Sequence, residues 1–179
     1  MKLKKTLFTL TMLFISAQWV FSFNGSGTDS SPYLIENASD WTTFANNVTS
    51  GQSYSGKYFK MTADIRTDVM VGKYKSENEA FKGTFDGNGH TICFVFTESG
   101  YNDHDIAPFR SINGATIKNL HTTGVITIGS YDNNHAAGIA CRTYGNCTIS
   151  SCRSDISING MGGGVYGGIV STSCLAPSQ

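Results

Sequence analysis

Two polar loops of similar composition lie one repeat apart in this sequence. The first is Tyr101-Asn102-Asp103-His104-Asp105, and the second is Tyr131-Asp132-Asn133-Asn134-His135. Carboxylate and amide oxygens are the ligands that Ca²⁺ takes in proteins, and stacked tyrosine rings could receive a sugar ring. The alternative is that both loops are polar only because they face solvent. The candidate metal ligands are Asp103, Asp105 and Asp132, and the candidate ligand-binding residues are Tyr101, His104, Tyr131 and His135.

These loops can meet only if the elements around them repeat at the same interval. Apolar anchors in small-residue settings occur at Phe109, Ile139 and Ile169, which are equally spaced and share the interval between the two loops. A fixed period of about 20–50 residues is typical of stacked supersecondary units that cannot bury their apolar faces alone. Residues one period apart would then lie ~4.8 Å from each other. We therefore expect the two loops on the same side of a solenoid.

Thr-Ile pairs follow the first two anchors, at Thr116-Ile117 and Thr148-Ile149, and Thr91-Ile92 fits the scheme as an earlier copy. Another apolar residue or a cysteine comes three positions after each of these isoleucines. The pattern predicts two buried columns, one of Val95, Leu120 and Cys152 and the other of Phe109, Ile139 and Ile169.

One segment with helical spacing precedes the repeats. Trp41, Phe44, Ala45 and Val48 recur at the interval of one helix face. Asn37 or Ser39 could serve as the N-cap, and Gly51 could end the helix. A repeat stack needs its open first coil covered, so we predict that this helix is a cap.

Asp86 and His90 could be interpreted as a catalytic acid beside a histidine. The stretch between them, Asp86-Gly87-Asn88-Gly89, contains two turn dipeptides in succession. We therefore interpret it as a structural corner.

Residues 1–22 are typical of a secretion signal, with three lysines followed by a short apolar run. Their removal leaves 10 basic and 13 acidic side chains, a net charge of −3, which gives no support to a nucleic-acid or anionic-membrane partner. The five cysteines match no zinc spacing. Unpaired core cysteines are the favoured interpretation, and pairing of Cys141 or Cys147 with Cys174 stays open.

The stretch at 81–92, FKGTFDGNGHTI, resembles the first-coil signature of right-handed parallel β-helix proteins of the pectin-lyase-like kind. The segments at 115–120, 137–140 and 167–170 are similar to GLUG-type repeats of secreted and surface proteins of Bacteroidetes and other bacteria. The opening, SPYLIENASDWTTFANNV, resembles the helical cap common before such repeats. The resemblance covers roughly residues 32–172.

We thus predict an all-β fold, a right-handed parallel β-helix of about three coils with an N-terminal amphipathic helical cap. The expected organisation is a signal peptide at 1–22, a lead-in at 23–36, a capping helix at 37–51 and β-helix repeats at 52–174, with coils anchored near 81–96, 107–128 and 137–158 and a partial coil at 165–174.

The expected role is non-catalytic adhesion or binding, toward a glycan or a protein ligand, by an exported protein that is secreted or held at the cell surface. Two alternatives stay open: a polysaccharide-active enzyme, lyase or glycosidase, or an N-terminal fragment of a larger surface protein such as an adhesin. The resemblance implies that enzymes of this fold need clustered carboxylates, and Arg110 and Arg142 fit surface positions better than a mechanism. We expect no cofactor other than Ca²⁺ and no membrane span in the mature chain. The incomplete last coil predicts one of three outcomes: self-association through an uncapped C-terminal end, a frayed C-terminal coil, or a native protein that continues past Gln179.

Overall fold

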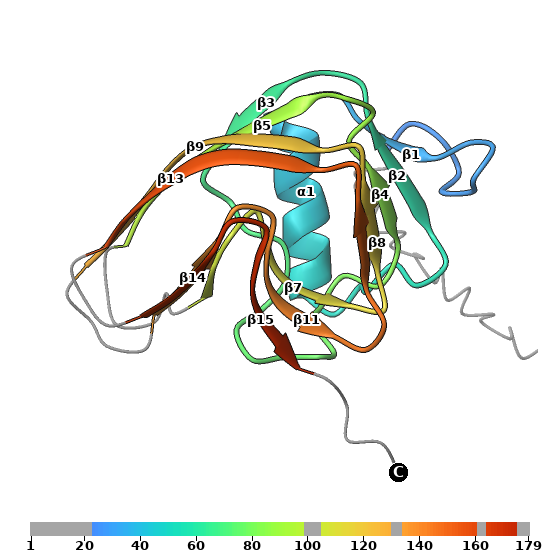
Figure 1. The fold of residues 1–179 in the computed structure, drawn as a ribbon. Helices are drawn as coiled ribbons and strands as arrows, with labels where there is room; N and C mark the ends of the chain where they lie inside the picture. Colours follow the sequence, from blue (N-terminus) through green and yellow to red (C-terminus); the bar gives the residue numbers. More distant parts are fainter. Residues whose placement is uncertain (1–22, 99–104, 130–133, 161–163, 175–179) are drawn as a thin grey trace, which may run out of the picture.

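The computed structural model describes residues 23–98, 105–129, 134–160 and 164–174. Within these ranges every strand pairs in parallel with its neighbours, and the strands stack as a β-solenoid of about four turns (Figure 1). The predicted fold class is confirmed, although the stack has about one turn more than the sequence suggested. None of the described residues forms a helix long and apolar enough to cross a membrane.

Four parallel sheets form the walls of the solenoid, and a full turn of the chain visits them in the order A, B, D and C. Sheet A contains β1 (Tyr33–Ile35), β2 (Tyr58–Met61), β4 (Thr84–Asp86), β8 (Thr116–Lys118) and β12 (Thr148–Ser150). Sheet B contains β3 (Ile65–Thr67), β5 (Thr91–Thr97), β9 (His121–Ile128) and β13 (Arg153–Gly160). Sheet D contains β6 (Asp105–Ile106), β10 (Asn134–Ala137) and β14 (Gly164–Gly167), and sheet C contains β7 (Phe109–Asn113), β11 (Ala140–Tyr144) and β15 (Val170–Cys174).

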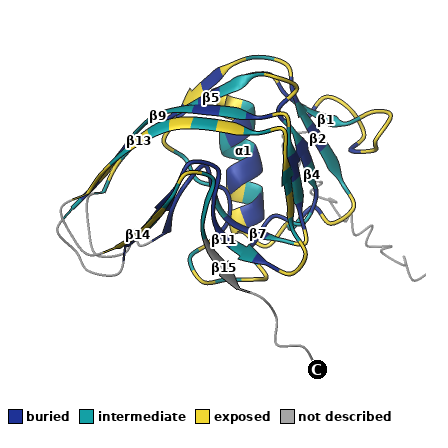
Figure 2. Cartoon of the chain, in the orientation of Figure 1, coloured by how far each residue is buried: buried dark blue, intermediate teal, exposed yellow. Residues whose placement is uncertain are grey.

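The helix predicted before the repeats is α1 (Ala38–Thr49). Its N-cap is Asn37, whose side chain accepts hydrogen bonds from the backbone N–H groups of two residues in the first turn. Trp41 and Phe44 are fully buried and pack against inward-facing rings of the solenoid, with ring centroids 5.4 Å apart for Trp41 and Phe109 and 5.8 Å apart for Phe44 and Phe85. The helix therefore covers the early turns, with its buried face toward the interior (Figure 2).

The predicted column of Val95, Leu120 and Cys152 is wrong in one member. Pairing of Arg153 with His121 places Cys152 beside Leu120, whereas Val95 pairs with Val125 further along sheet B. The error comes from the Thr-Ile pairs that set the alignment: Thr91-Ile92 lies in sheet B, where Thr91 pairs with His121, whereas Thr116-Ile117 lies in sheet A. The counterpart of Thr116-Ile117 in sheet A is Thr84-Phe85.

The second predicted column is also displaced. Phe109 pairs with Ala140, which pairs with Val170, so Phe109 stands one residue out of line with Ile139 and Ile169. The register shifts by one between these two sheets: three residues separate Ala136 from Ala140, but only two separate their partners Ile106 and Phe109. Phe109 and Ile139 are nevertheless both fully buried.

Cys141 and Cys147 are free thiols, so neither of the disulfides that the sequence left open is present. Cys141 lies beside Ser171, with its Sγ 3.1 Å from the serine Oγ, while Cys174 pairs with Tyr144 three positions further along the strand. Burial raises the pKa of the Cys141 thiol to about 12, which makes it an unreactive core residue.

Candidate ligand-binding groove

The structure brings together two of the residues that the sequence nominated as a site. Asp105 in β6 pairs with His135 in β10, one turn later, as the spacing of the two loops predicted. The other five nominated residues lie outside the described residues: Tyr101, Asp103, His104, Tyr131 and Asp132.

Asp105 already has a cationic partner. Its side chain is completely buried, and both carboxylate oxygens accept hydrogen bonds from the Arg142 guanidinium, the longer of them at 3.2 Å from Nη2 to Oδ1. His135 Nδ1 lies 3.5 Å from the same carboxylate, and the Arg142 guanidinium carbon lies 5.7 Å from the centre of the Tyr74 ring. The expectation that Arg142 lies at the surface is therefore wrong, because only 8% of the residue is exposed.

The ion pair between Asp105 and Arg142 makes Asp105 less accessible to the predicted calcium ion. A cation at Asp105 would have to compete with Arg142 for both carboxylate oxygens. Among the described residues there is no group of three His, Cys, Asp or Glu side chains that could hold a metal ion. Since Asp103 and Asp132 lie outside that part of the chain, the calcium site stays a prediction.

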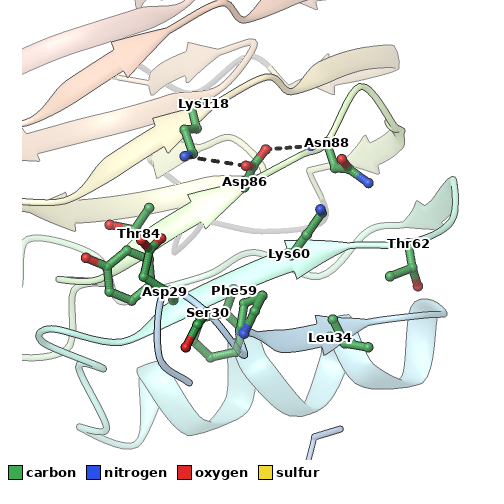
Figure 3. A pocket seen from close by; sticks show the side chains of 12 residues that line it. Asp29, Ser30, Leu34, Phe59, Lys60, Thr62, Thr84, Asp86, Asn88 and Lys118 are labelled. Carbon is green, nitrogen blue, oxygen red and sulfur yellow. Dashed lines mark hydrogen bonds and ion pairs between the residues drawn. The ribbon is translucent and has the colours of Figure 1, made fainter. Parts of the chain in front are cut away.

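A different feature, a groove on the outer face of sheet A, has the geometry of a binding site (Figure 3). It is a cavity of about 480 Å³ between the strands and the lead-in segment that precedes β1. Most of its lining side chains are polar. They are Asp29, Ser30, Pro32, Leu34, Tyr58, Phe59, Lys60, Thr62, Thr84, Asp86, Asn88 and Lys118.

The floor of this groove consists of two columns of outward-facing side chains, because alternate residues of each strand face solvent. The strand register places Leu34, Lys60, Asp86 and Lys118 in one column, one residue from each of β1, β2, β4 and β8. The second column contains Tyr58 and Thr84 within the groove, and it continues beyond the groove with Thr116 and Thr148 of the next turns.

The corner after β4 fixes one end of the groove. Asn88 has a φ of 51° and Gly89 a φ of 80°, as expected for the predicted turn. Gly87 must lack a side chain, because a Cβ there would stand 2.6 Å from the Asn119 carbonyl oxygen. The Asn88 side chain donates a hydrogen bond to the Met61 carbonyl across 3.2 Å, which ties the corner to the preceding turn.

The carboxylate of Asp86 is held in its ionised form. Burial alone would raise its pKa, but hydrogen bonds from the Asn119 amide and the Asn88 backbone N–H, together with the charge of Lys118, outweigh that effect and lower the pKa. The relevant distances from Asp86 are 3.0 Å to Asn119 Nδ2, 2.8 Å to Asn88 N and 3.5 Å to Lys118 Nζ.

Lys60 differs from Lys118 because no described acidic side chain forms an ion pair with it. The Lys60 side chain lines the groove, and its ammonium group lies near the corner after β4 (Figure 3). The lead-in wall is anchored by backbone hydrogen bonds, from Tyr58 N to Gly27 O at 3.1 Å and from Leu34 N to Asn24 O at 2.9 Å. The groove thus has a fixed wall, a polar floor and a cation available to a ligand.

Sequence reasoning missed this groove. A usable signal was present in the Thr-Ile pairs: the isoleucine of each pair faces the core, so its threonine must face outward. The columns could not be assembled without the correct register, and the wall comes from a lead-in segment whose sequence carries no repeat.

Comparison with known proteins gives one similarity. The chain is 27% identical over 169 residues to halomucin of Haloquadratum walsbyi, in an alignment that covers 88% of this chain. The chain spans about 2% of the length of that relative. No family model matches the chain, and no solved structure matches it.

Proposed function

We propose that the chain is an exported surface protein that binds a glycan in the groove on sheet A and does not transform it chemically. The observation that carries this proposal is the Lys60 ammonium, which has no ion-pair partner among the described residues and lies in the same groove as Tyr58 and the Thr84 hydroxyl. The parallel β-solenoid and the similarity to halomucin fit a surface or binding role.

A glycan suits the groove better than a protein partner does. Hot spots of protein interfaces are formed by tryptophan, tyrosine and arginine in well-packed, desolvated pockets. The groove instead offers hydroxyl, amide and ammonium groups, with Tyr58 as its large aromatic ring beside the nearly buried Phe59. Its two columns repeat at the strand spacing of about 4.8 Å, which matches a polymer that presents hydroxyl groups at regular intervals.

The protonation state of Asp86 does not suit the general acid of a glycosidase. Hydrolysis of a glycosidic bond needs one carboxylic acid whose pKa is raised so that it can donate a proton. The pKa of Asp86 is lowered, and Lys118 forms an ion pair with it. Asp86 therefore acts as an anchor that positions Lys118 and the corner at Asn88.

A glycan array probed with the chain, with and without calcium, tests this proposal. The hits are then titrated with the wild-type chain, with Lys60→Ala and with Lys82→Ala, a matched control that removes a lysine outside the groove. Loss of a charge-assisted hydrogen bond costs about 1.5–3 kcal/mol, so Lys60→Ala should weaken binding by about tenfold or more. The control should bind as the wild type does.

Two results would contradict the proposal. Equal affinity of the wild type and Lys60→Ala for every hit would place the ligand elsewhere on the solenoid. Release of new reducing ends or unsaturated sugars from a bound polysaccharide would show that the protein is an enzyme.

A further inference from the structure

The two ends of the solenoid are built differently. The early turns are covered by α1, whose Trp41 and Phe44 fill the space between inward-facing rings. At the other end β12, β13, β14 and β15 are each the last strand of their sheet among the described residues. Val165 and Tyr166, the exposed large hydrophobic residues of the described ranges, lie in β14, with 49% and 41% of their surfaces exposed.

The longest of these edges is β13, which pairs with β9 on one side. The Arg153 N–H donates to the Leu120 carbonyl, so the odd-numbered residues of β13 direct their backbone groups toward β9. Consecutive residues of a strand direct these groups to opposite sides. Hence Ser154, Ile156 and Ile158 direct their N–H and C=O groups to the open edge. In agreement, the Ile156 N–H donates to the Ser154 hydroxyl instead of to a strand, at 3.4 Å.

The same three residues face the interior of the solenoid. Ile156 and Ile158 are partly buried and pack against the core, whereas Arg153 and Asp155 face solvent and form an ion pair at 2.7 Å. No charged side chain and no proline stands on the inward face of β13. The strand therefore lacks these features, which protect natural sheet edges from pairing with another chain.

We propose that the occupant of this edge is a second copy of the chain, related by a two-fold axis normal to sheet B. Such an axis makes the two β13 strands antiparallel and keeps their inward faces on the same side. Residues directly opposite each other then share a face, so inward even-numbered residues must oppose even-numbered ones. The even-numbered residues are also the ones whose backbone N–H and C=O groups are available at the edge. The side-chain orientation and the hydrogen bonds between the strands therefore require the same register.

An axis through Ser157 satisfies both conditions. It places Ile156 of each copy opposite Ile158 of the other, which brings four isoleucines together across the interface. On the outer face Asp155 then opposes Asn159, and Ser157 opposes itself, so that no like charges meet. The edge is complementary to itself in shape, backbone hydrogen bonding and charge, as an isologous interface requires.

Sedimentation velocity of the chain tests this dimer. The wild type should sediment as a dimer, and Ile158→Lys should raise the dissociation constant by about tenfold or more, because two unpaired cations would enter the apolar contact. Thr127→Lys is the matched control: it adds the same charge to the outer face of the same sheet on β9, away from the edge. The control should remain a dimer.

Oxidative cross-linking gives a second test that does not depend on the fold of Ile158→Lys. Ser157→Cys places two thiols across the axis, and peptide mapping should find a disulfide that joins position 157 of the two copies. Asn159→Cys faces Asp155 of the other copy, so its two thiols lie apart and should form no disulfide with each other. A monomeric wild type, an open-ended series of oligomers, or cross-linking at position 159 but not at position 157 would overturn the proposed interface.

Discussion

Removal of Arg142 should destabilise the protein more than removal of an exposed arginine. Arg142 is the counter-ion of Asp105, which is completely buried, and its own side chain is only 9% exposed. In the Arg142→Met variant the carboxylate would stay buried between sheets D and C without its bidentate partner. Breaking a buried ion pair by removing one member costs about 3–5 kcal/mol, which corresponds to a fall of about 6–20 °C in melting temperature for a chain of this size.

The assay is urea denaturation followed by circular dichroism, with Arg66→Met as the control. Arg66 is exposed on β3, and its loss should change the free energy of unfolding by no more than about 0.5 kcal/mol. In the double variant Arg142→Met/Asp105→Asn no charge of this pair remains, so much of the lost stability should return. A coupling energy of about 2 kcal/mol or more is expected from the double-mutant cycle. Additive effects of the two substitutions, or an Arg142→Met variant that is as stable as Arg66→Met, would refute the reasoning.

Three further outcomes are expected. Leu120→Asp buries an unpaired charge at a site with 1% exposure, which costs several kcal/mol; it should unfold the chain, and an unchanged thermal midpoint would contradict the burial. If the predicted loop site binds calcium, calcium should raise the melting temperature by mass action. The triple change of Asp103, Asp105 and Asp132 to Asn should abolish this shift. If calcium does not change the melting temperature of the wild type, the predicted calcium site does not exist. Because the pKa of Asp86 is lowered in the fold, its contribution to stability is complete above the unfolded-state pKa and is lost as the pH falls through the folded pKa. Asp86→Asn should therefore flatten the fall of melting temperature as the pH drops below the unfolded-state pKa of an aspartate, and an unchanged slope would argue against the Asp86 hydrogen bonds.

The fold was predictable because its signals are local and repeated. The Trp41, Phe44, Ala45 and Val48 face identified α1, and all four side chains are buried in the structure. The regular interval identified the stack and correctly brought Asp105 next to His135.

The register was less predictable because corners of different length interrupt the period. The offset between paired residues is smaller for β1 and β2 than for β8 and β12, as the pairs Tyr33 with Phe59 and Thr116 with Thr148 show, so no single interval aligns all turns. Val95 was misplaced because Thr-Ile pairs occur in two different sheets, and Phe109 was misplaced because the register shifts by one residue before β11. Hydrophobicity alone does not detect such a shift, since Phe109 and Ile139 are both buried although they do not pair.

The candidate groove was not predictable for a related reason. Lys60, Asp86 and Lys118 follow one another at unequal intervals along the chain, and they become neighbours only through the true register. The ion pair of Asp105 with Arg142 could not be predicted from the sequence either, because the two residues are distant in sequence and belong to two different sheets.

The most direct test of the central claim is a chemical-shift map of the ¹⁵N-labelled chain titrated with a glycan selected on the array. Binding in the groove predicts that the largest shifts fall on the backbone amides of β2, β4 and β8 and of the corner at Asn88. The Lys60→Ala variant should show these shifts only at higher glycan concentration. Shifts confined to residues 99–104 and 130–133, with β2 and β4 unchanged, would contradict the groove and favour the loop site instead.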